Sequence, residues 1–453
     1  MGSGWKERLK KRRAPQVGLI ALGCPKNVVD AERLLGRFLE AGYEPTTDPA
    51  QADLLVVNTC GFKADAEAES RQAIAEMAAL KAAHPGKRLI VAGCLAQRYG
   101  AQLQAEIPQI DLLAGTTGHD HLLERLAIPI APMPEADFTT RSEVAPRLLT
   151  TPPHTAYLKI AEGCNNPCTF CIIPQLRGPF RSRPLEEIVA EAEALAAGGV
   201  RELIIVSQDT TLYGRDLLPR LSLVDLLARL EPIPGVRWIR LMYLYPTMIT
   251  DSLLDHVAAS DKVLPYFDLP LQHAHAEVLK RMQRAERPDD LERLVGRIRQ
   301  RMPEAVLRSV FIVGFPGESD AEFAQLQQFM AATRFDHVGI FAYSDEREAA
   351  AYHLPDKIPA EVAQARRAML MEMQQTISRE KLAAQVGRSA LVLVDGIEQG
   401  RAIGRTRGQA LEVDGITRLE GRPPARVGSL VPVVITGSTD YDLRARVAGV
   451  PVR

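Results

Sequence analysis

Three cysteines lie close together in the stretch 162–171. Cys164 and Cys168 are separated by three residues, and Cys168 and Cys171 by two. Four cysteines would complete a tetrahedral zinc site or give every iron of a cubane iron–sulfur cluster a thiolate. Three leave one metal corner open, and an open corner on a cluster is where a small molecule can bind. The alternative, three structural thiols in a loop, is disfavoured because thiols this dense seldom serve packing.

The other three cysteines share a position relative to predicted strands. Short apolar runs at 17–22, 53–57 and 88–92 are followed by Cys24, Cys60 and Cys94. Helical patterns lie between the runs, at 28–38 and 64–83. This alternation predicts a parallel sheet with crossover helices.

The spacing of these cysteines equals one strand–helix repeat, with 36 residues from Cys24 to Cys60 and 34 from Cys60 to Cys94. Each thiol therefore follows the carboxyl end of its strand. Parallel strands bring these ends to one sheet edge, where open α/β sheets bind ligands. We interpret the three thiols as a second cluster site with an open iron. The alternative is three unrelated buried cysteines, for which packing gives no reason.

The composition bounds the class of protein. The 453 residues are 46% hydrophobic and 25% charged, with a net charge of −1, which argues against a nucleic-acid binder over its whole surface. No apolar run is long enough to span a bilayer. The basic stretch 1–13 lacks the apolar segment of a secretory signal, so we interpret it as a solvated tail. With no export signal, metal ligation is favoured over disulfides, and the expected compartment is the cytoplasm.

A proline-rich stretch around 129–153 indicates a linker to a second α/β segment. Helical patterns at 185–197 and 221–230 separate some of its predicted strands. The six predicted strands are 156–161, 202–206, 236–244, 266–271, 307–313 and 338–343. Six repeats suit a partial barrel, whose chemistry collects on the loops after the strands. The cysteine loop follows the first of these strands.

Short valine- and leucine-rich runs broken by glycine follow from residue 385, at 390–396, 410–415 and 430–435. They predict a small antiparallel β-barrel. Residues 385–453 hold ten arginines, no lysine and seven acids, a net charge of about +3, with Tyr441 as the only aromatic residue. Single-stranded RNA platforms usually combine a stronger basic face with several aromatics. A protein partner is therefore at least as well supported as RNA.

Taken together, these motifs resemble the methylthiotransferase family of radical S-adenosylmethionine (SAM) enzymes. The stretches that carry the resemblance, besides the loop 162–171, are LGCPKN at 22–27, NTCGF at 58–62, GCLAQRY at 93–99, SQDTTLYG at 207–214 and YFDLPLQH at 266–273. The resemblance runs from about residue 17 to the end. It favours the branch that modifies an aspartate of small-subunit ribosomal protein S-twelve over the branch that acts on adenosine of transfer RNA.

The resemblance implies an α/β protein of three parts. They are an N-terminal parallel α/β domain with an auxiliary cluster (15–130), a partial (β/α)6 radical SAM barrel (150–383) and a TRAM-like β-barrel (385–453). It also implies two [4Fe–4S] clusters and SAM as cofactors. Cys164, Cys168 and Cys171 would hold the SAM-binding cluster, and Cys24, Cys60 and Cys94 the auxiliary one.

Several strand-end residues are candidate SAM contacts: Glu162, Arg183, Gln208 and Gly314. Gly314 lies in a Gly-Phe-Pro-Gly turn, where glycine lets backbone approach a ligand closely. Each has a simpler interpretation, as a surface charge or a turn residue. The same holds for Gln272 and His273, which follow the fourth strand and could merely satisfy a barrel rim.

The implied reaction is the removal of a hydrogen from the β-carbon of the target aspartate by a 5′-deoxyadenosyl radical, followed by transfer of a methylated sulfur from the auxiliary cluster. The implied partners are ribosomal protein S-twelve as substrate, an electron donor such as a flavodoxin-like protein, and a sulfur donor that the sequence leaves open. No membrane partner is expected, and RNA contact would involve the C-terminal barrel. An alternative from another class is a non-catalytic metal-containing protein that docks on RNA or the ribosome.

Overall fold

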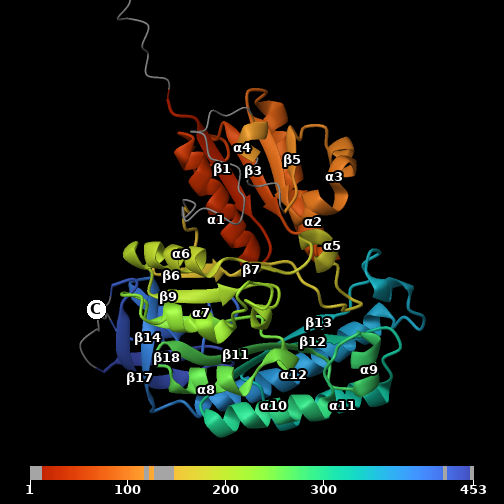
Figure 1. The fold of residues 1–453 in the computed structure, drawn as a ribbon, viewed down its shortest axis with the longest axis vertical. Helices are drawn as coiled ribbons and strands as arrows, with labels where there is room; N and C mark the ends of the chain where they lie inside the picture. Colours follow the sequence, from red (N-terminus) through yellow and green to blue (C-terminus); the bar gives the residue numbers. More distant parts are fainter. Residues whose placement is uncertain (1–12, 117–121, 127–146, 422–425, 449–453) are drawn as a thin grey trace, which may run out of the picture. The chain divides into compact units, whose positions relative to one another are not determined.

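The fold of the chain is known from a computed structural model (Figure 1), which describes residues 13–116, 122–126, 147–421 and 426–448. The expected tail at 1–13, apart from Arg13, and most of the expected linker lie outside these residues. The chain forms two compact units. Unit 1 comprises Met1–Thr150 and Gln175–Arg177, and unit 2 comprises Thr151–Pro174 and Gly178–Arg453. The expected second and third parts of the chain therefore belong to one compact unit.

Unit 1 contains a parallel sheet, as the alternating pattern predicts. Its strands are β1 (Gln16–Ala21), β2 (Glu44–Pro45), β3 (Leu54–Thr59), β4 (Arg88–Gly93) and β5 (Leu112–Ala114), in the order β2-β1-β3-β4-β5. β3 is buried along its whole length, and this explains its continuous apolar run. The sequence patterns did not identify β2 and β5, which are only two and three residues long.

Helices cover both faces of this sheet. They are α1 (Pro25–Glu40), α2 (Ala64–Ala83), α3 (Cys94–Glu106) and α4 (Leu122–Arg125). α1 and α4 share one hydrophobic core with residues of β1, β3 and β4. Its members include Phe38 of α1 and Val56 of β3. α2 and α3 pack on the opposite face, where Ile74 and Leu103 share a second hydrophobic core with Leu55 and Val91. Two cores hold the sheet rigidly between helices, so the strand ends are fixed in position.

The first part of unit 2 is a partial barrel of six strands, as predicted, in the order β13-β12-β11-β10-β9-β6. The strands are β6 (Thr155–Lys159), β9 (Glu202–Val206), β10 (Trp238–Leu241), β11 (Val263–Gln272), β12 (Val306–Val313) and β13 (His337–Ala342). All pairings are parallel. A short ribbon of β7 (Ala161–Glu162) and β8 (Arg181–Ser182) flanks the cysteine loop.

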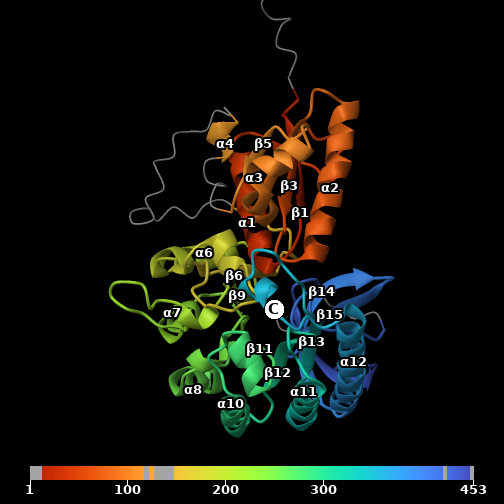
Figure 2. The ribbon, with the colours of Figure 1, turned by 90° about the vertical axis from the view of Figure 1, so that its right-hand side faces the viewer.

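Helices lie along the outside of this partial barrel (Figure 2). They are α6 (Leu185–Ala197), α7 (Leu223–Leu230), α8 (Asp251–Ala259), α10 (Pro288–Arg301), α11 (Asp320–Thr333) and α12 (Ala360–Ala383). The connecting segments form α5 (Ile173–Arg177), α9 (Ala276–Arg281) and the one-turn helices η1 (Thr210–Leu212), η2 (Pro246–Met248) and η3 (Ala350–His353). Within the described residues, none of the helices combines the length and the apolar character that crossing a membrane requires.

The third strand of the barrel is shorter than the apolar run 236–244 suggests. The chain leaves the sheet after Leu241, and Tyr243 adopts a left-handed backbone conformation with φ of 59°. The Tyr243 backbone N–H donates to Asp268 Oδ2 (2.9 Å), a side chain of the next strand. At Tyr243, a hydrogen bond to a side chain thus takes the place of the backbone pairing between strands. The apolar pattern of 236–244 gives no indication of this bond.

The C-terminal part of unit 2 is a closed five-stranded barrel. Its strands are β14 (Ser389–Glu398), β15 (Arg401–Thr406), β16 (Thr417–Leu419), β17 (Leu430–Ser438) and β18 (Leu443–Val447), in the order β14-β15-β16-β18-β17. Four pairings are antiparallel as predicted, but β16 and β18 pair in parallel. An odd number of strands cannot alternate in direction around a closed ring, so one parallel pair is required.

The apolar run 410–415 is not a strand of this barrel. It forms a turn in which the Ala410 N–H donates to Asp414 Oδ2 (2.8 Å) and Glu412 has a positive φ of 65°. Asp414 Oδ2 also accepts from the Tyr266 hydroxyl (2.6 Å) on β11 of the larger barrel. The turn therefore serves the junction between the two barrels of unit 2.

Candidate functional site

The loop 162–171 follows β6 through the short strand β7, as expected of a partial-barrel site. Gly163 has a φ of +78°, and a Cβ there would lie 2.1 Å from the Pro179 carbonyl oxygen. The next residue, Cys164, donates its backbone N–H to Gly178 O (3.1 Å). Only glycine combines this backbone conformation with such close packing. The first cysteine is thereby held at a fixed position.

The loop presents its thiols to backbone donors. Asn166 N–H points at Cys164 Sγ (3.4 Å), and Ile173 N–H points at Cys171 Sγ (3.4 Å). The Thr169 hydroxyl donates to Arg281 O (2.9 Å), which ties the middle of the loop to α9. Donors aimed at sulfur stabilise thiolates, the form that binds iron.

Burial raises the pKa of all three thiols in the metal-free loop, that of Cys171 to about 12. The buried Arg284 opposes this at Cys168, where its Nη1 lies 3.8 Å from Sγ. Arg284 also pairs with Glu286 (2.5 Å) and lies over the ring of Tyr245. Because these thiols hold their protons tightly, iron binding must displace the protons as the iron–sulfur bonds form.

We expect Gly163→Ala to destroy the iron-binding form of this loop. An alanine at φ of +78° costs about 1–2 kcal/mol, and its methyl group would also overlap Pro179 O. Iron bound per chain after anaerobic reconstitution should fall by the content of one cluster. The matched control is Gly199→Ala, which has a φ of +107° but no atom within 4 Å of its Cβ position. Equal iron contents in the two variants would contradict the expectation.

A polar cluster adjoins the loop at the carboxyl ends of β6 and β9. Glu162 Oε1 accepts from Gln208 Nε2 (2.8 Å), and Glu162 Oε2 accepts from Lys159 Nζ (2.7 Å). Arg183 donates to the Lys159 carbonyl (2.6 Å) and pairs with Glu191 (2.7 Å) on α6. The structure therefore brings together three of the four candidate SAM contacts.

Gly314 is not part of this cluster. It follows β12 with a φ of +73°, and a Cβ there would lie 2.4 Å from the Ala363 Cβ on α12. The close packing against Ala363 gives a structural reason for this glycine, and its contact with SAM stays a prediction. His273 is likewise buried, and burial lowers its pKa to about 3, so it is neutral at physiological pH. Its Nδ1 accepts from the His275 N–H (3.0 Å), a local structural contact.

Cys24, Cys60 and Cys94 lie at the carboxyl ends of β1, β3 and β4, as the repeat spacing predicts. Besides burial, the charge of Cys24 raises the pKa of Cys60, and the charges of Cys24 and Cys60 raise that of Cys94. Gly23 makes the close approach possible, because a Cβ on it would lie 2.7 Å from Cys60 Cβ and 3.1 Å from its Sγ. The residue before Cys24 is thus packed directly against Cys60.

The thiols of this second group differ in pKa. Burial raises the pKa of Cys94 to about 12 and also raises that of Cys60. At Cys24, burial is outweighed by the charges of Lys26 and Arg177 together with backbone N–H groups, and its pKa is lowered. Cys24 is therefore the thiol of this group that loses its proton most readily.

Each group offers three cysteine thiols and no fourth. Among the residues that the structure describes, no three His, Cys, Asp or Glu side chains are grouped closely enough to hold one metal ion. A cubane cluster places each thiolate on a different iron, so three thiolates leave one iron without a cysteine. All six cysteines are free thiols. Both groups of three therefore suit clusters that keep one iron open.

The sequence patterns missed three side chains beside the thiols: Arg284 at Cys168, and Asn27 and Arg177 beside the second group. Asn166 Nδ2, which donates to Asp209 Oδ2 (3.0 Å), was missed as well. Asn27 follows Cys24 by one helical turn, and that spacing was the one available signal. The two arginines reach the thiols from distant positions in the chain.

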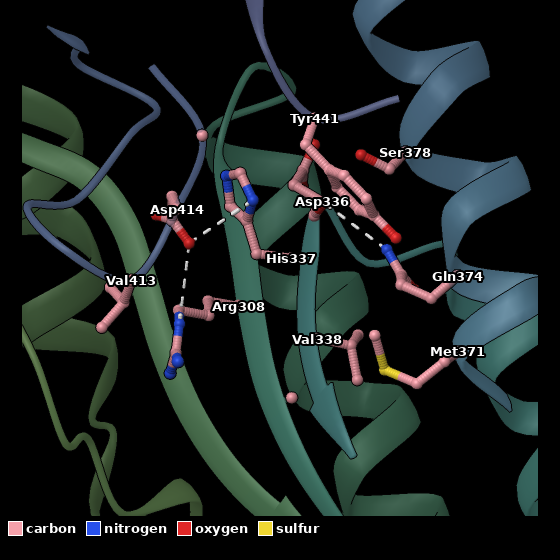
Figure 3. Close-up of a pocket in the computed structure, with 12 residues that line it drawn as sticks. Arg308, Asp336, His337, Val338, Met371, Gln374, Ser378, Val413, Asp414 and Tyr441 are labelled. Carbon is pink, nitrogen blue, oxygen red and sulfur yellow. Dashed lines mark hydrogen bonds and ion pairs between the residues drawn. The ribbon is translucent and has the colours of Figure 1, made fainter. Parts of the chain in front are cut away.

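A cavity of about 300 Å³ lies elsewhere in unit 2, at the amino ends of β12 and β13 (Figure 3). Its wall includes Asp414, which lies 3.7 Å from Arg308 Nε and 3.5 Å from His337 Nδ1. The cysteine loop follows the carboxyl end of β6, the opposite sheet edge. This cavity is therefore not the site of the cluster chemistry.

Three family models match the chain. Residues 16–115 match the uncharacterized protein family UPF0004, residues 158–330 match the radical SAM superfamily, and residues 386–448 match the TRAM domain. Each match falls within one of the structural parts described above. The radical SAM match includes the loop with Cys164, Cys168 and Cys171, and it supports SAM and an iron–sulfur cluster as cofactors.

Curated relatives match nearly the whole chain. The ribosomal protein uS12 methylthiotransferase RimO of Aquifex aeolicus is 44% identical, over 95% of this chain and 97% of its own. Those of Pelotomaculum thermopropionicum and Symbiobacterium thermophilum are 45% and 46% identical, over 94% and 95% of this chain and 98% and 90% of theirs. The chain belongs to the RimO family.

Solved structures support the fold of this RimO-family chain. The radical SAM methyltransferase TsrM from Kitasatospora setae superposes with a TM-score of 0.52, at 17% identity, over 72% of this chain and 73% of that one. The cobalamin-dependent SAM radical enzyme OxsB gives a TM-score of 0.55 at 12% identity, over 81% of this chain and 58% of that one. Identities this low establish the fold alone.

Proposed function

We propose that this chain is a radical SAM methylthiotransferase that adds a methylthio group to the β-carbon of an aspartate in small-subunit ribosomal protein uS12. The observation that carries the proposal is the pair of three-thiol groups, each at the carboxyl edge of its own parallel sheet, in a chain of the RimO family. One open cluster accounts for SAM binding. A second accounts for a sulfur that must be delivered to carbon.

We assign Cys164, Cys168 and Cys171 to the SAM-binding [4Fe–4S] cluster, and Cys24, Cys60 and Cys94 to an auxiliary [4Fe–4S] cluster. The cofactors supply a 5′-deoxyadenosyl radical able to take hydrogen from an unactivated carbon, which no acid or base of the protein can deprotonate at neutral pH. The protein's own contribution is to hold the thiols and to orient SAM. The three functional parts then correspond to 15–130, 150–383 and 385–453.

The polar cluster beside the loop is the proposed binding site for the polar groups of SAM. Glu162 is a partly exposed carboxylate already fixed by Gln208 and Lys159 (2.8 and 2.7 Å). A carboxylate held in place by two donors is pre-organised to accept a hydrogen bond from an ammonium group without further ordering. Arg183, through the Lys159 carbonyl, supports this arrangement.

We expect Glu162→Gln to weaken SAM binding to the cluster-loaded protein about ten- to a hundredfold, since a hydrogen bond to a charged group is worth about 1.5–3 kcal/mol. Isothermal titration of the anaerobic protein with SAM measures this. Glu186→Gln is the control. Glu186 is an exposed glutamate of α6 that pairs with Arg229 of α7 (2.8 Å), so the same substitution there removes an ion pair outside the polar cluster. Unchanged affinity in Glu162→Gln would remove Glu162 from the SAM site.

The C-terminal barrel is the proposed contact with RNA or with the ribosomal substrate. Arg418 on β16 and Arg444 on β18 are register partners in the parallel pair, and both are exposed. Arg446, two residues further along β18, is exposed as well, so these side chains project from the same face of the barrel. A row of guanidinium groups suits phosphate or an acidic protein surface. The electron donor proposed is a flavodoxin-like protein, and the proposed compartment is the cytoplasm.

Anaerobic reconstitution tests the class of protein. The proposal predicts iron and sulfide for two clusters per chain and release of 5′-deoxyadenosine from SAM after reduction. A chain that binds iron without cleaving SAM would instead be a non-catalytic metal-containing protein, and a chain that binds no iron would contradict the proposal altogether.

A further inference from the structure

Arg177 is a buried guanidinium at the second thiol group. The end of α5, Gln175–Arg177, packs within unit 1, although the chain before and after it belongs to unit 2. The Arg177 side chain is 1% exposed, and its Nη1 donates to Asp30 Oδ2 (3.1 Å) on α1. Its Nη2 donates to Asn27 Oδ1. A long cationic side chain is thus fixed in a fully enclosed position.

Asn27 connects this guanidinium to a cysteine. Its Nδ2 donates to Leu22 O (2.9 Å) beyond the end of β1 and to Thr59 O (2.8 Å) at the end of β3. These bonds fix the amide so that Oδ1 faces Cys94 Sγ (3.9 Å). A metal-bound thiolate has no proton to donate to that oxygen. Arg177, whose guanidinium donates to the same Asn27 oxygen, then keeps that oxygen hydrogen-bonded.

The charge of Arg177 reaches every thiol of the group. It lowers the pKa of Cys24, Cys60 and Cys94, whereas burial acts in the opposite direction at each. Asp30 offsets part of this charge, and Lys26 adds to it at Cys24. Glu69 acts against it at Cys60. The geometry agrees, because Arg177 Nη2 and Cys94 Sγ both contact Asn27 Oδ1.

We propose that Arg177 is a positioning residue of the auxiliary cluster, holding Asn27 against Cys94 and supplying a buried positive charge that raises the cluster's reduction potential. The inference rests on the proposed assignment of Cys24, Cys60 and Cys94 to that cluster. Uptake of one electron adds one negative charge to the cluster and its thiolates. A nearby buried cation stabilises the more negative form, so its removal makes reduction harder.

A matched control is an ion pair whose acidic partner, Glu32, lies on the same helix as Asp30. Arg147 pairs with the buried Glu32 of α1 (2.5 Å), and its side chain is 4% exposed. The Glu32 carboxylate also accepts from the Thr150 N–H (2.7 Å). Removing Arg147 therefore breaks a buried ion pair of unit 1 that involves none of the three thiols. The R147M variant therefore shows how the loss of a buried ion pair in unit 1 affects the cluster content and the reduction potential in general.

The experiment uses the full chain with Cys164, Cys168 and Cys171 all replaced by alanine, so that only the auxiliary cluster can form. R177M, R177K and R147M are made in this background and reconstituted anaerobically with iron and sulfide. Dithionite supplies the electron, and the potential of the one-electron step is read from the EPR signal of the reduced cluster. Iron and sulfide per chain are measured for each variant.

We expect R177M to shift the potential to more negative values, R177K to restore most of the shift, and R147M to leave it unchanged. Loss of the cluster from R177M, with retention in R177K and R147M, would support the same role. Equal potentials in the background, R177M and R147M, or equal cluster loss in R177M and R147M, would overturn it. A background chain without any iron would overturn the auxiliary cluster itself, and the role of Arg177 with it.

Discussion

Replacing Cys24, Cys60 and Cys94 together by alanine is expected to abolish methylthio transfer while reductive cleavage of SAM continues. The reason is that SAM cleavage requires only the cluster on Cys164, Cys168 and Cys171. Delivery of sulfur requires the second thiol group, which lies on a different sheet. The measurement is parallel mass spectrometry of 5′-deoxyadenosine and of the modified substrate.

The matched variant replaces Cys164, Cys168 and Cys171 by alanine and should lose both activities. Circular dichroism of the two triple variants checks that each is folded. Methylthiolated product from the first variant would remove the auxiliary cluster from the account. Loss of SAM cleavage in the first variant would show that the two thiol groups do not act as separate sites.

Arg405 is expected to be essential for the stability of unit 2. This arginine of the C-terminal barrel is 2% exposed, and it pairs with Glu202 on β9 (2.6 Å) and Asp395 on β14 (2.8 Å). Glu202 also pairs with the buried Arg240 (2.9 Å). Arg405→Met would leave carboxylates buried with fewer partners, at a cost of about 3–5 kcal/mol.

Urea unfolding followed by the fluorescence of Trp238 measures this cost, since that indole lies on β10 beside Arg240 and is buried. The control is Arg418→Met, which removes an ion pair with Glu398 (3.3 Å) in which both side chains are at least half exposed. Such a pair contributes about 0–1 kcal/mol. If both variants unfold at the same urea concentration, the buried network does not hold the two barrels of unit 2 together.

The placement of the thiols could be predicted from the sequence because it depends on strand–helix periodicity. β1, β3 and β4 each end just before a cysteine, and a parallel sheet brings those ends to one edge. The six-stranded partial barrel followed from the same alternation. Only local patterns were needed, and local patterns are what a single sequence displays.

The surroundings of the thiols could not be predicted in this way. Arg284 reaches Cys168 across 116 positions, and Arg177 reaches Asn27 across 150. Such contacts depend on tertiary packing, for which the periodicity of one segment holds no information. The prediction of a barrel strand at 410–415 was wrong for a similar reason. Asp414 accepts a hydrogen bond from the Tyr266 hydroxyl of the other barrel, and a local apolar pattern contains no information on such a contact.

The most direct test of the account is a comparison of substrates. The anaerobically reconstituted chain, with SAM, sulfide and a reductant, is offered small-subunit ribosomal protein uS12 and transfer RNA in separate reactions. We predict that mass spectrometry finds one methylthio group on an aspartate of uS12 and unmodified adenosine in the transfer RNA. A methylthiolated adenosine together with unmodified uS12 would contradict the account.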